Sequence, residues 1–267
     1  MAVARKINYD ISNIHDCIVD DREDYQRIGQ GEKKKLYLNR INRVQKNPEL
    51  KEILSMKHIH GYDVKDVKNF ARIGILPPEL MIVDERIRDM CLNQFWLTNP
   101  ITRVKAFGRC PAYNNRPCCP PLSPSSKETR KLLDRSDIFV MLQSKLLGNE
   151  AIMTDPHWSW QYDTVLKLEE ELKLALGKSK VLAKYGAGPC VICGPIGCTR
   201  DETCKHPDKK FCAVESVGMA VGQMCRDMAY LSGDKRWEIN WIKNWSLPTQ
   251  TPDKFKLTFG LALKLPN

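Results

Sequence analysis

Four cysteines crowd into residues 188–206, and this crowding constrains the chain more than any other feature. Cys190, Cys193, Cys198 and Cys204 form a C-x2-C-x4-C-x5-C array. A short loop cannot bury four cysteines as hydrophobic side chains, because its backbone needs water or hydrogen-bond partners. Thiolates that converge on a soft metal resolve this conflict, since the metal bonds replace the missing core. The array therefore predicts a metal centre.

The spacing of the array leaves the identity of the metal open. Ferredoxins bind a [4Fe–4S] cluster through a tighter run of cysteines, so the analogy with them is one of chemistry and not of motif. Four-cysteine zinc sites usually carry two C-x2-C pairs, and residues 188–206 hold one. We favour an iron–sulfur cluster and keep zinc as the alternative. Disulfides or free thiols come last, partly because eleven cysteines are an odd number.

The composition predicts a cytoplasmic protein. The 267 residues are enough for one large domain or two modest ones. The sequence shows no apolar run as long as a membrane span and no signal-peptide pattern, so we expect no membrane partner. In a reducing cytoplasm, cysteines serve as metal ligands or catalysts more often than as disulfides. An air-sensitive cluster would suit an anaerobic host.

A net charge of +10 favours anionic partners. An acidic redox protein, an anionic cofactor and nucleic acid all meet that description. No groove-reading motif and no interleaving of aromatic and basic residues is present, so we expect no nucleic acid. We expect a redox protein or a larger enzyme complex as the partner.

Hydrophobic periodicity predicts an α/β fold: a small mixed sheet with a βαβ crossover and cysteine-rich metal loops, preceded by a small helical N-terminal region. We divide the chain into a helical region, residues 1–78, and a metal-binding domain, residues 79–267. Helices are expected in the first region at residues 31–46, 48–56 and 64–72. The basic residues of the first helix are interpreted as a solvated face, and His58 and His60 as a satisfied pair.

In the second region the pattern alternates between helices and strands. A helix over residues 79–93 turns Cys91 inward, and a capping box of Ser125 and Glu128 opens another helix that ends near Asp134. The remaining expected elements are strands at 137–146 and 180–185, helices at 160–176 and 215–231, and a half-buried antiparallel strand at the C-terminus. The strand–helix–strand unit suggests a parallel crossover, which places the cysteine array at the carboxyl end of a strand, where ligands bind in such sheets. Trp237, Trp241 and Trp245 form a helical stripe.

A second cysteine-rich loop lies between residues 108 and 124. It holds Cys110, Cys118 and Cys119 and is framed by five prolines, which suits a rigid loop that presents sulfur. The side chains of adjacent residues diverge in an extended chain, so we expect that one of Cys118 and Cys119 does not bind the same metal.

The two cysteine regions together resemble an uncharacterised prokaryotic family described as predicted metal-binding proteins, over residues 80–265. The first shared signature runs from the helix of Arg86 and Arg88 to Cys91, then through Cys110 and Tyr113 to Cys119-Pro120-Pro121. The second consists of Gly188, the four cysteines of the array, His206-Pro207, and Glu215 with Gly218. The gap between Cys91 and Cys110 looks enlarged, and Cys118, Cys212 and Cys225 look like additions.

The resemblance implies a metal, in our interpretation iron–sulfur, and groups seven cysteines as four plus three. We therefore expect a [4Fe–4S] cluster on Cys190, Cys193, Cys198 and Cys204. A second cluster would lie on Cys91, Cys110 and Cys119, with Cys118, Cys212, Cys225 or an external group as its fourth ligand. A single site that draws on both regions remains open.

Three functions follow from these sites. The first is electron transfer as a subunit or accessory of a larger redox enzyme. The second is an enzyme that uses an open cluster iron in sulfur removal or transfer. The third is a zinc-stabilised interaction module. The sequence does not decide whether the protein is an enzyme.

Overall fold

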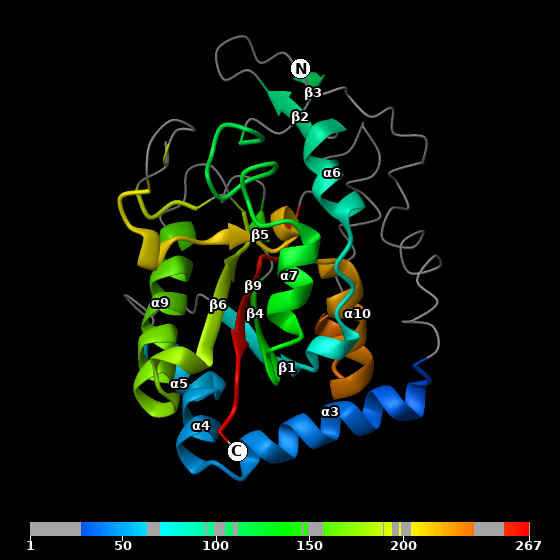
Figure 1. Ribbon diagram of the computed structural model, residues 1–267, viewed down its shortest axis with the longest axis vertical. Helices are drawn as coiled ribbons and strands as arrows, with labels where there is room; N and C mark the ends of the chain where they lie inside the picture. The colour runs from blue at the N-terminus through cyan, green and yellow to red at the C-terminus, as the bar shows by residue number, and fades with distance from the viewer. Residues whose placement is uncertain are drawn as a thin grey trace.

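The computed structural model describes residues 28–62, 70–93, 95–98, 105–108, 112–145, 147–148, 157–188, 190–193, 198, 204–237 and 254–266. Its centre is a five-stranded mixed sheet with the order β1-β4-β9-β6-β7 (Figure 1). These strands are β1 Phe70–Leu76, β4 Ile138–Ser144, β9 Thr258–Leu263, β6 Val181–Gly186 and β7 Cys212–Ala213. Two small ladders pair β2 Phe95–Thr98 with β3 Lys105–Gly108, and β5 Leu147–Gly148 with β8 Lys254–Phe255.

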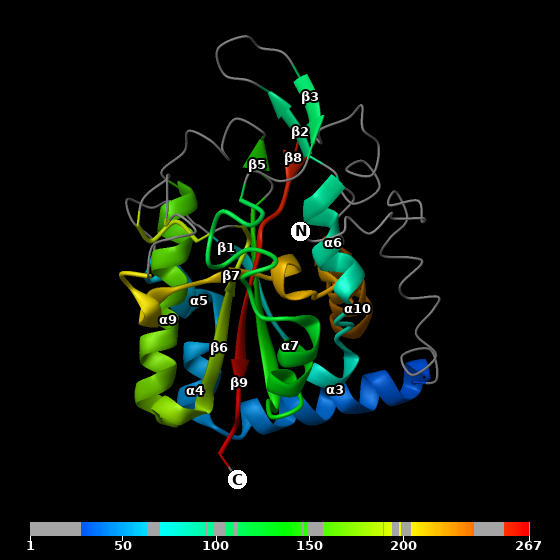
Figure 2. The same cartoon turned by 45° about the horizontal axis from the view of Figure 1, so that its top comes forward.

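Helices cover both faces of the sheet (Figures 1 and 2). One face packs against α4 Pro48–Ile53, α5 Met56–His60 and α9 His157–Leu176. The other packs against α7 Ser126–Leu133 and α10 Val221–Ser232. The remaining helices in the described residues are α3 Gln30–Gln45, which crosses one end of the molecule (Figure 1), and α6 Glu85–Asn93. Short 3-10 turns are η2 Pro78–Leu80, η3 Lys178–Lys180, η4 Pro207–Lys209, η5 Glu215–Val217 and η6 Lys235–Trp237.

The strands explain why both faces are covered. In β4, Ile138, Val140 and Leu142 point to the α9 side, while Phe139 and Met141 point to the α10 side. Successive side chains of a strand alternate between faces, so an unbroken apolar run needs a helix layer on each side. The antiparallel strand expected at the C-terminus is confirmed as β9, but its expected half-burial is wrong for the same reason, since every residue of β9 is buried.

The order of the strands separates the two that we expected to be joined by a parallel crossover. β9 is antiparallel to both β4 and β6, so these two run in the same direction with β9 between them. The ring of Phe139 on β4 packs directly against Gly260 of β9. A Cβ atom at Gly260 would lie 2.1 Å from Phe139 Cζ, so there is no room for a larger residue. The α/β class, the mixed sheet and the helices before it are confirmed. The proposed boundary at residue 78 remains a prediction, although β1 lies before it and pairs with β4.

Several predicted helices differ from the structure at their ends. The helix expected over residues 64–72 is wrong where the structure describes it, because β1 begins at Phe70. Residues 79–93 form a helix only from Glu85, since Val83 first pairs with Met219. The helix expected from Glu215 begins at Val221, after a glycine with left-handed backbone. The capping box of Ser125 and Glu128 is confirmed.

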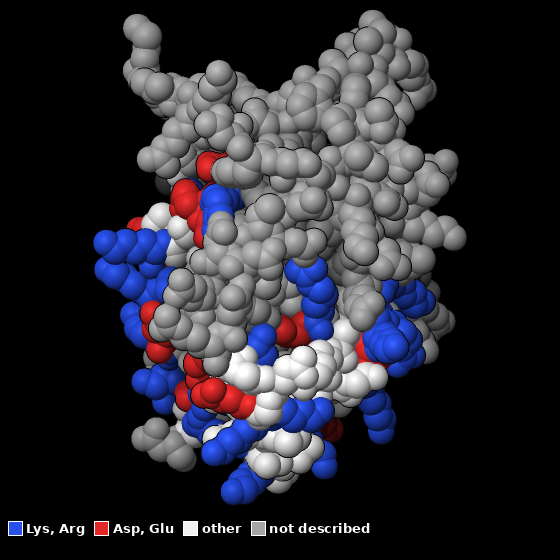
Figure 3. All heavy atoms as spheres, turned by 90° about the vertical axis from the view of Figure 1, so that its right-hand side faces the viewer, with Lys and Arg blue, Asp and Glu red and all other residues white. Residues whose placement is uncertain are grey.

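The basic residues of α3 fasten that helix to its neighbours, so a purely solvated face is wrong. Lys34 Nζ donates to the Leu231 carbonyl at 2.8 Å, and Lys33 Nζ lies 3.8 Å from the Asp227 carboxylate. Arg40 pairs with Glu79. Their charges are therefore partly neutralised within the fold. Figure 3 shows basic side chains with acidic ones among them on the described part of the face that lies to the right in Figure 1.

The two histidines of the H-x-H pair have protein partners. His58 Nε2 lies 2.5 Å from the Glu171 carboxylate on α9, and His60 Nε2 lies 3.1 Å from the Phe70 carbonyl. The interpretation as a satisfied pair is confirmed. None of the helices that the structure describes is both long and apolar enough to cross a membrane. Trp237 is buried, whereas Trp241 and Trp245 lie outside the described residues.

Asp137 provides a test of how the elements are tied at one end of the sheet. Its carboxylate accepts from Arg43 Nη1 on α3 at 2.7 Å and from the Leu265 backbone N–H at 2.9 Å. Burial would raise the pKa of Asp137, but these two hydrogen bonds outweigh it and lower the pKa below its usual 3.8. The carboxylate therefore stabilises the fold above that pH, and this contribution is lost as the pH falls through the lowered pKa.

We predict that Asp137→Asn lowers the free energy of unfolding at pH 7 by about 1 kcal/mol, given the partial exposure of the pair. Urea unfolding at pH 7 and at pH 3 measures this, and the difference from the wild type should shrink at the lower pH. Asp134→Asn is the control, because its partner Arg130 is a single residue on the same helix. An equal loss of free energy of unfolding in both variants would contradict the role that we assign to Asp137.

Candidate metal centre

The cysteine array follows β6 at its carboxyl end, as the sequence predicts. Gly188 comes two residues after the end of the strand, and its carbonyl accepts from the Tyr162 hydroxyl at 3.3 Å. The structure describes residues 190–193, 198 and 204 of the remaining segment. Cys190 is half-buried and packs against both cores, whereas Cys193 is exposed.

The described thiols of the array lie together on the surface side of Cys190. Cys198 Sγ lies 3.6 Å from Cys193 Sγ, and the thiol of Cys204 hydrogen-bonds that of Cys198. Burial and then the neighbouring Cys193 thiol raise the pKa of Cys198. Thiols this close repel one another once ionised, and a bound cation removes that repulsion.

The second cysteine loop does not have the extended backbone that we assumed. Residues 112–123 fold into successive turns, and the Cys119 N–H donates to the Arg116 carbonyl at 3.0 Å. In this compact backbone, Cys118 Sγ and Cys119 Sγ lie 4.0 Å apart and both are buried. The expectation that their side chains diverge is therefore wrong, and both sulfurs face the same region.

A hydrogen bond joins the two cysteine segments. The backbone N–H of Cys190 donates to Cys118 Sγ at 3.3 Å, and Arg116 Nη1 donates to the Cys190 carbonyl at 3.3 Å. The hydrogen bond from Cys119, the Cys190 N–H and the Arg116 charge together lower the pKa of Cys118 to about 6, against the opposing effect of burial. The lowered pKa favours the thiolate form of Cys118, which is the form that binds metals.

In two further cysteines the pKa of the thiol is raised instead of lowered. Burial raises the pKa of Cys212, which lies in β7 within electrostatic reach of Cys118 and Cys190, to about 12. Burial likewise raises the pKa of Cys225 to about 12. Cys225 Sγ lies 3.6 Å from Gln143 Nε2 and 3.9 Å from Thr258 Oγ1 on the α10 side of the sheet. It therefore sits in the core as a small hydrophobic side chain.

Arg88 on α6 holds the second cysteine loop in place. Its buried guanidinium donates from Nε to the Ser216 carbonyl and from Nη2 to the Ser123 carbonyl, both at 3.1 Å. It also pairs with Glu85. Arginine suits this place because its planar group carries several donors in fixed directions.

Ser216 completes the connection from the other side. Its hydroxyl donates toward the Cys118 carbonyl at 3.0 Å and the Ala213 carbonyl at 2.8 Å, and its own carbonyl accepts from Ser123 Oγ at 2.6 Å. Gly218 ends this turn with a φ of +87°, and its carbonyl accepts from the Asp84 N–H at 2.8 Å. A Cβ atom there would lie 2.9 Å from the Asp84 carbonyl oxygen, so the turn requires glycine.

The other predicted site residues are not brought into this group by the described structure. Cys91 is half-buried on α6, while Cys110 lies outside the described residues. The predicted second cluster on Cys91, Cys110 and Cys119 therefore remains a prediction. Within the described ranges, no three cysteine, histidine or carboxylate side chains have the arrangement of a metal site. The donor chemistry nevertheless fits a soft metal, because thiols from two segments gather at one end of the sheet.

The fold and site thus define a cysteine-rich α/β protein with thiols gathered at the carboxyl end of β6. The chain belongs to the family of predicted metal-binding proteins DUF2284, whose model matches residues 97–243. This confirms the family resemblance; Cys91 and the helix of Arg88 precede the matched segment. No curated protein and no solved structure matches the chain.

Sequence reasoning missed the role of two residues. Cys118 looked like an addition to the family pattern, yet it makes the contact between the segments. Arg88 was part of a signature without an assigned task. The run Cys118-Cys119 after Arg116 carried a signal for the first, since a cation two residues away favours a thiolate.

We predict that Arg88→Lys lowers the free energy of unfolding by about 2 kcal/mol, because one ammonium group cannot reach acceptors on both Ser123 and Ser216. Chemical denaturation measures this loss. Arg86→Lys is the matched control, since Arg86 pairs with Asp84 in its own turn and should cost under about 1 kcal/mol. Equal stability of the two variants would show that Arg88 does not hold the loop.

Proposed function

We propose that the protein binds a [4Fe–4S] cluster at the gathered thiols and passes electrons as a subunit or accessory of a larger redox enzyme. The observation that carries the proposal is the N–H to sulfur hydrogen bond from Cys190 to Cys118. It joins the two cysteine segments, and it is one of the causes that lower the pKa of the Cys118 thiol to about 6. Hydrogen bonds to ligand sulfurs are one of the means by which proteins set the reduction potential of such clusters.

The proposed ligands are the four cysteines of the array, with Cys118 as a candidate ligand from the second loop. Five thiols are more than one cluster needs, so Cys118 either replaces one of the four or serves a second cluster with Cys119. The cationic Arg116 beside them would offset part of the negative charge that thiolates and sulfide bring. The family supports a metal in general, and the choice of iron over zinc rests on the cysteine spacing.

Electron transfer is favoured over catalysis by the chemistry of the site. The thiols lie near the surface at Cys193, which suits exchange of electrons with a docked protein. The net charge of +10 supports an acidic partner.

Iron and acid-labile sulfide on anaerobically purified protein test the cofactor directly. We expect about four of each per chain for one cluster and about eight for two, with a visible absorbance that dithionite bleaches. Zinc in a comparable amount, without sulfide, would contradict the proposal and favour the zinc module.

The contribution of Cys118 is tested by comparing two buried cysteines. We predict that Cys118→Ser loses at least about half of the bound iron, because a hydroxyl is a poor ligand for iron–sulfur clusters. Cys225→Ser is the control and should keep its iron, since Thr258 and Gln143 can hydrogen-bond the new hydroxyl. Full iron content in Cys118→Ser would remove Cys118 from the ligand set.

A further inference from the structure

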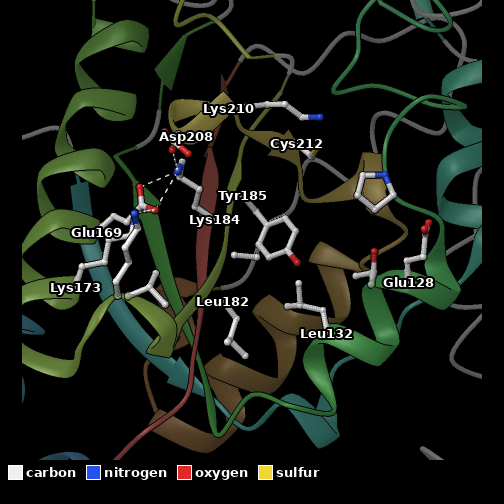
Figure 4. Close-up of a pocket in the computed structure, with 15 residues that line it drawn as sticks. Glu128, Leu132, Glu169, Lys173, Leu182, Lys184, Tyr185, Asp208, Lys210 and Cys212 are labelled. Atoms are coloured by element: carbon white, nitrogen blue, oxygen red, sulfur yellow. Dashed lines mark hydrogen bonds and ion pairs between the residues drawn. The ribbon is translucent and has the colours of Figure 1, made fainter. Parts of the chain in front are cut away.

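A groove of about 510 Å³ runs along β6 between α7 and α9 (Figure 4). It ends at Cys212, the cysteine of β7 that lies within electrostatic reach of Cys118 and Cys190. The groove is thus adjacent to the gathered thiols, and the metal-site proposal does not use its side chains.

The groove lies against an open edge of the sheet. β7 pairs with β6 only at Tyr185 and Gly186. Along Val181–Lys184, β6 has no partner on that side among the strands that the structure describes. The backbone of an open edge can pair with an extended segment of another chain, which would here continue the line of β7.

The two sides of this edge differ in chemistry. On the α7 side, Tyr185 and Leu182 form an apolar surface with Leu132, because an irregularity in β6 between Val181 and Ala183 brings both side chains to this side. On the α9 side, Lys184 Nζ lies 2.8 Å from the Glu169 carboxylate, which also holds Lys173 at 2.6 Å. Figure 4 shows Lys184 and Tyr185 pointing in opposite directions. Because side chains alternate along a strand, the matching segment would place apolar residues on one side and charged ones on the other.

The charge of the groove favours an acidic segment. Four lysines line it against three carboxylates, and Glu169 is already shared by two of those lysines. Lys178 is exposed, and the Lys210 ammonium is close enough to Cys212 to act on its thiol. Thr129 Oγ1 lines the groove as well; it is buried and has no hydrogen-bond partner.

A second copy of the chain would fit this edge poorly. Pairing two β6 edges would bring the groove lysines of two copies together, although only Lys184 lies on β6 itself, and like charges brought together oppose such self-pairing. The same lysines attract carboxylates. The edge is therefore suited to a different chain that carries acidic residues.

We propose that the open edge of β6 binds an extended segment of alternating apolar and acidic residues from the partner protein, by strand addition. The inference rests on the proposed function, since the partner is the redox protein inferred there. Strand addition would place that protein next to Cys212 and so next to the thiols that we assign to the cluster. Lys178 and Lys210 would meet the acidic side chains.

The test uses the full chain and a fluorescein-labelled peptide of alternating valine and glutamate. We expect saturable binding by fluorescence anisotropy, no binding of the valine–lysine counterpart, and slower hydrogen exchange at the amides of Val181–Lys184. The double variant Lys178→Glu, Lys210→Glu should weaken binding by at least about tenfold. The control Lys35→Glu, Lys46→Glu changes the net charge equally at exposed positions of α3 and its C-cap, and should weaken binding by under about twofold.

Equal weakening by both double variants, or unchanged exchange at β6, would overturn strand addition. So would a dimer of the wild-type chain that Lys178→Glu, Lys210→Glu abolishes, because the edge would then belong to a second copy. Iron is measured on the same samples. If the iron-loaded protein does not bind the peptide, this inference alone is overturned. If protein that holds no iron binds the peptide, the proposed function alone is overturned.

Discussion

The cysteine site depends on one buried cation. The guanidinium of Arg88 must find hydrogen-bond acceptors where water is excluded, and it finds them in the carbonyls of Ser123 and Ser216. Those carbonyls belong to the second cysteine loop and to the turn before α10. The Ser216 hydroxyl extends the connection to the Cys118 carbonyl. Removing this cation would take one hydrogen-bond donor from each of these two carbonyls, so the position of Cys118 depends on Arg88.

The sheet provides the second half of the arrangement. Cys190 follows β6 at the end of the sheet, and Cys212 lies in β7 at the same end. The two strands are parallel and end together. The loop held by Arg88 then presents Cys118 to the Cys190 N–H. One end of the α/β fold thus brings together sulfur atoms from segments that are 72 residues apart in the sequence. The open edge of β6 leads from this end to the surface.

Local patterns in the sequence predicted what is local in the fold. The capping box of Ser125 and the apolar stripe of α9 each depend on residues that are close together in the sequence, and both were found as expected. The first residues of the strand β1 were mistaken for the end of a helix, because its sequence FARIGIL does not alternate cleanly between apolar and polar residues. The insertion of β9 between β4 and β6, and the contact of Cys118 with Cys190, depend on residues far apart in the chain. No local spacing could reveal them. The assignment of seven cysteines to metal sites rests on the sequence and the family, with Cys110 outside the described residues.

X-ray absorption at the iron edge of anaerobically purified protein tests the central claim most directly. A [4Fe–4S] cluster on the gathered thiols predicts a first shell made of sulfur and a second shell of iron neighbours. Both shells should persist in Cys225→Ser and weaken together in Cys118→Ser. Protein that carries zinc with a sulfur shell alone, or iron surrounded by oxygen and nitrogen, would contradict the account.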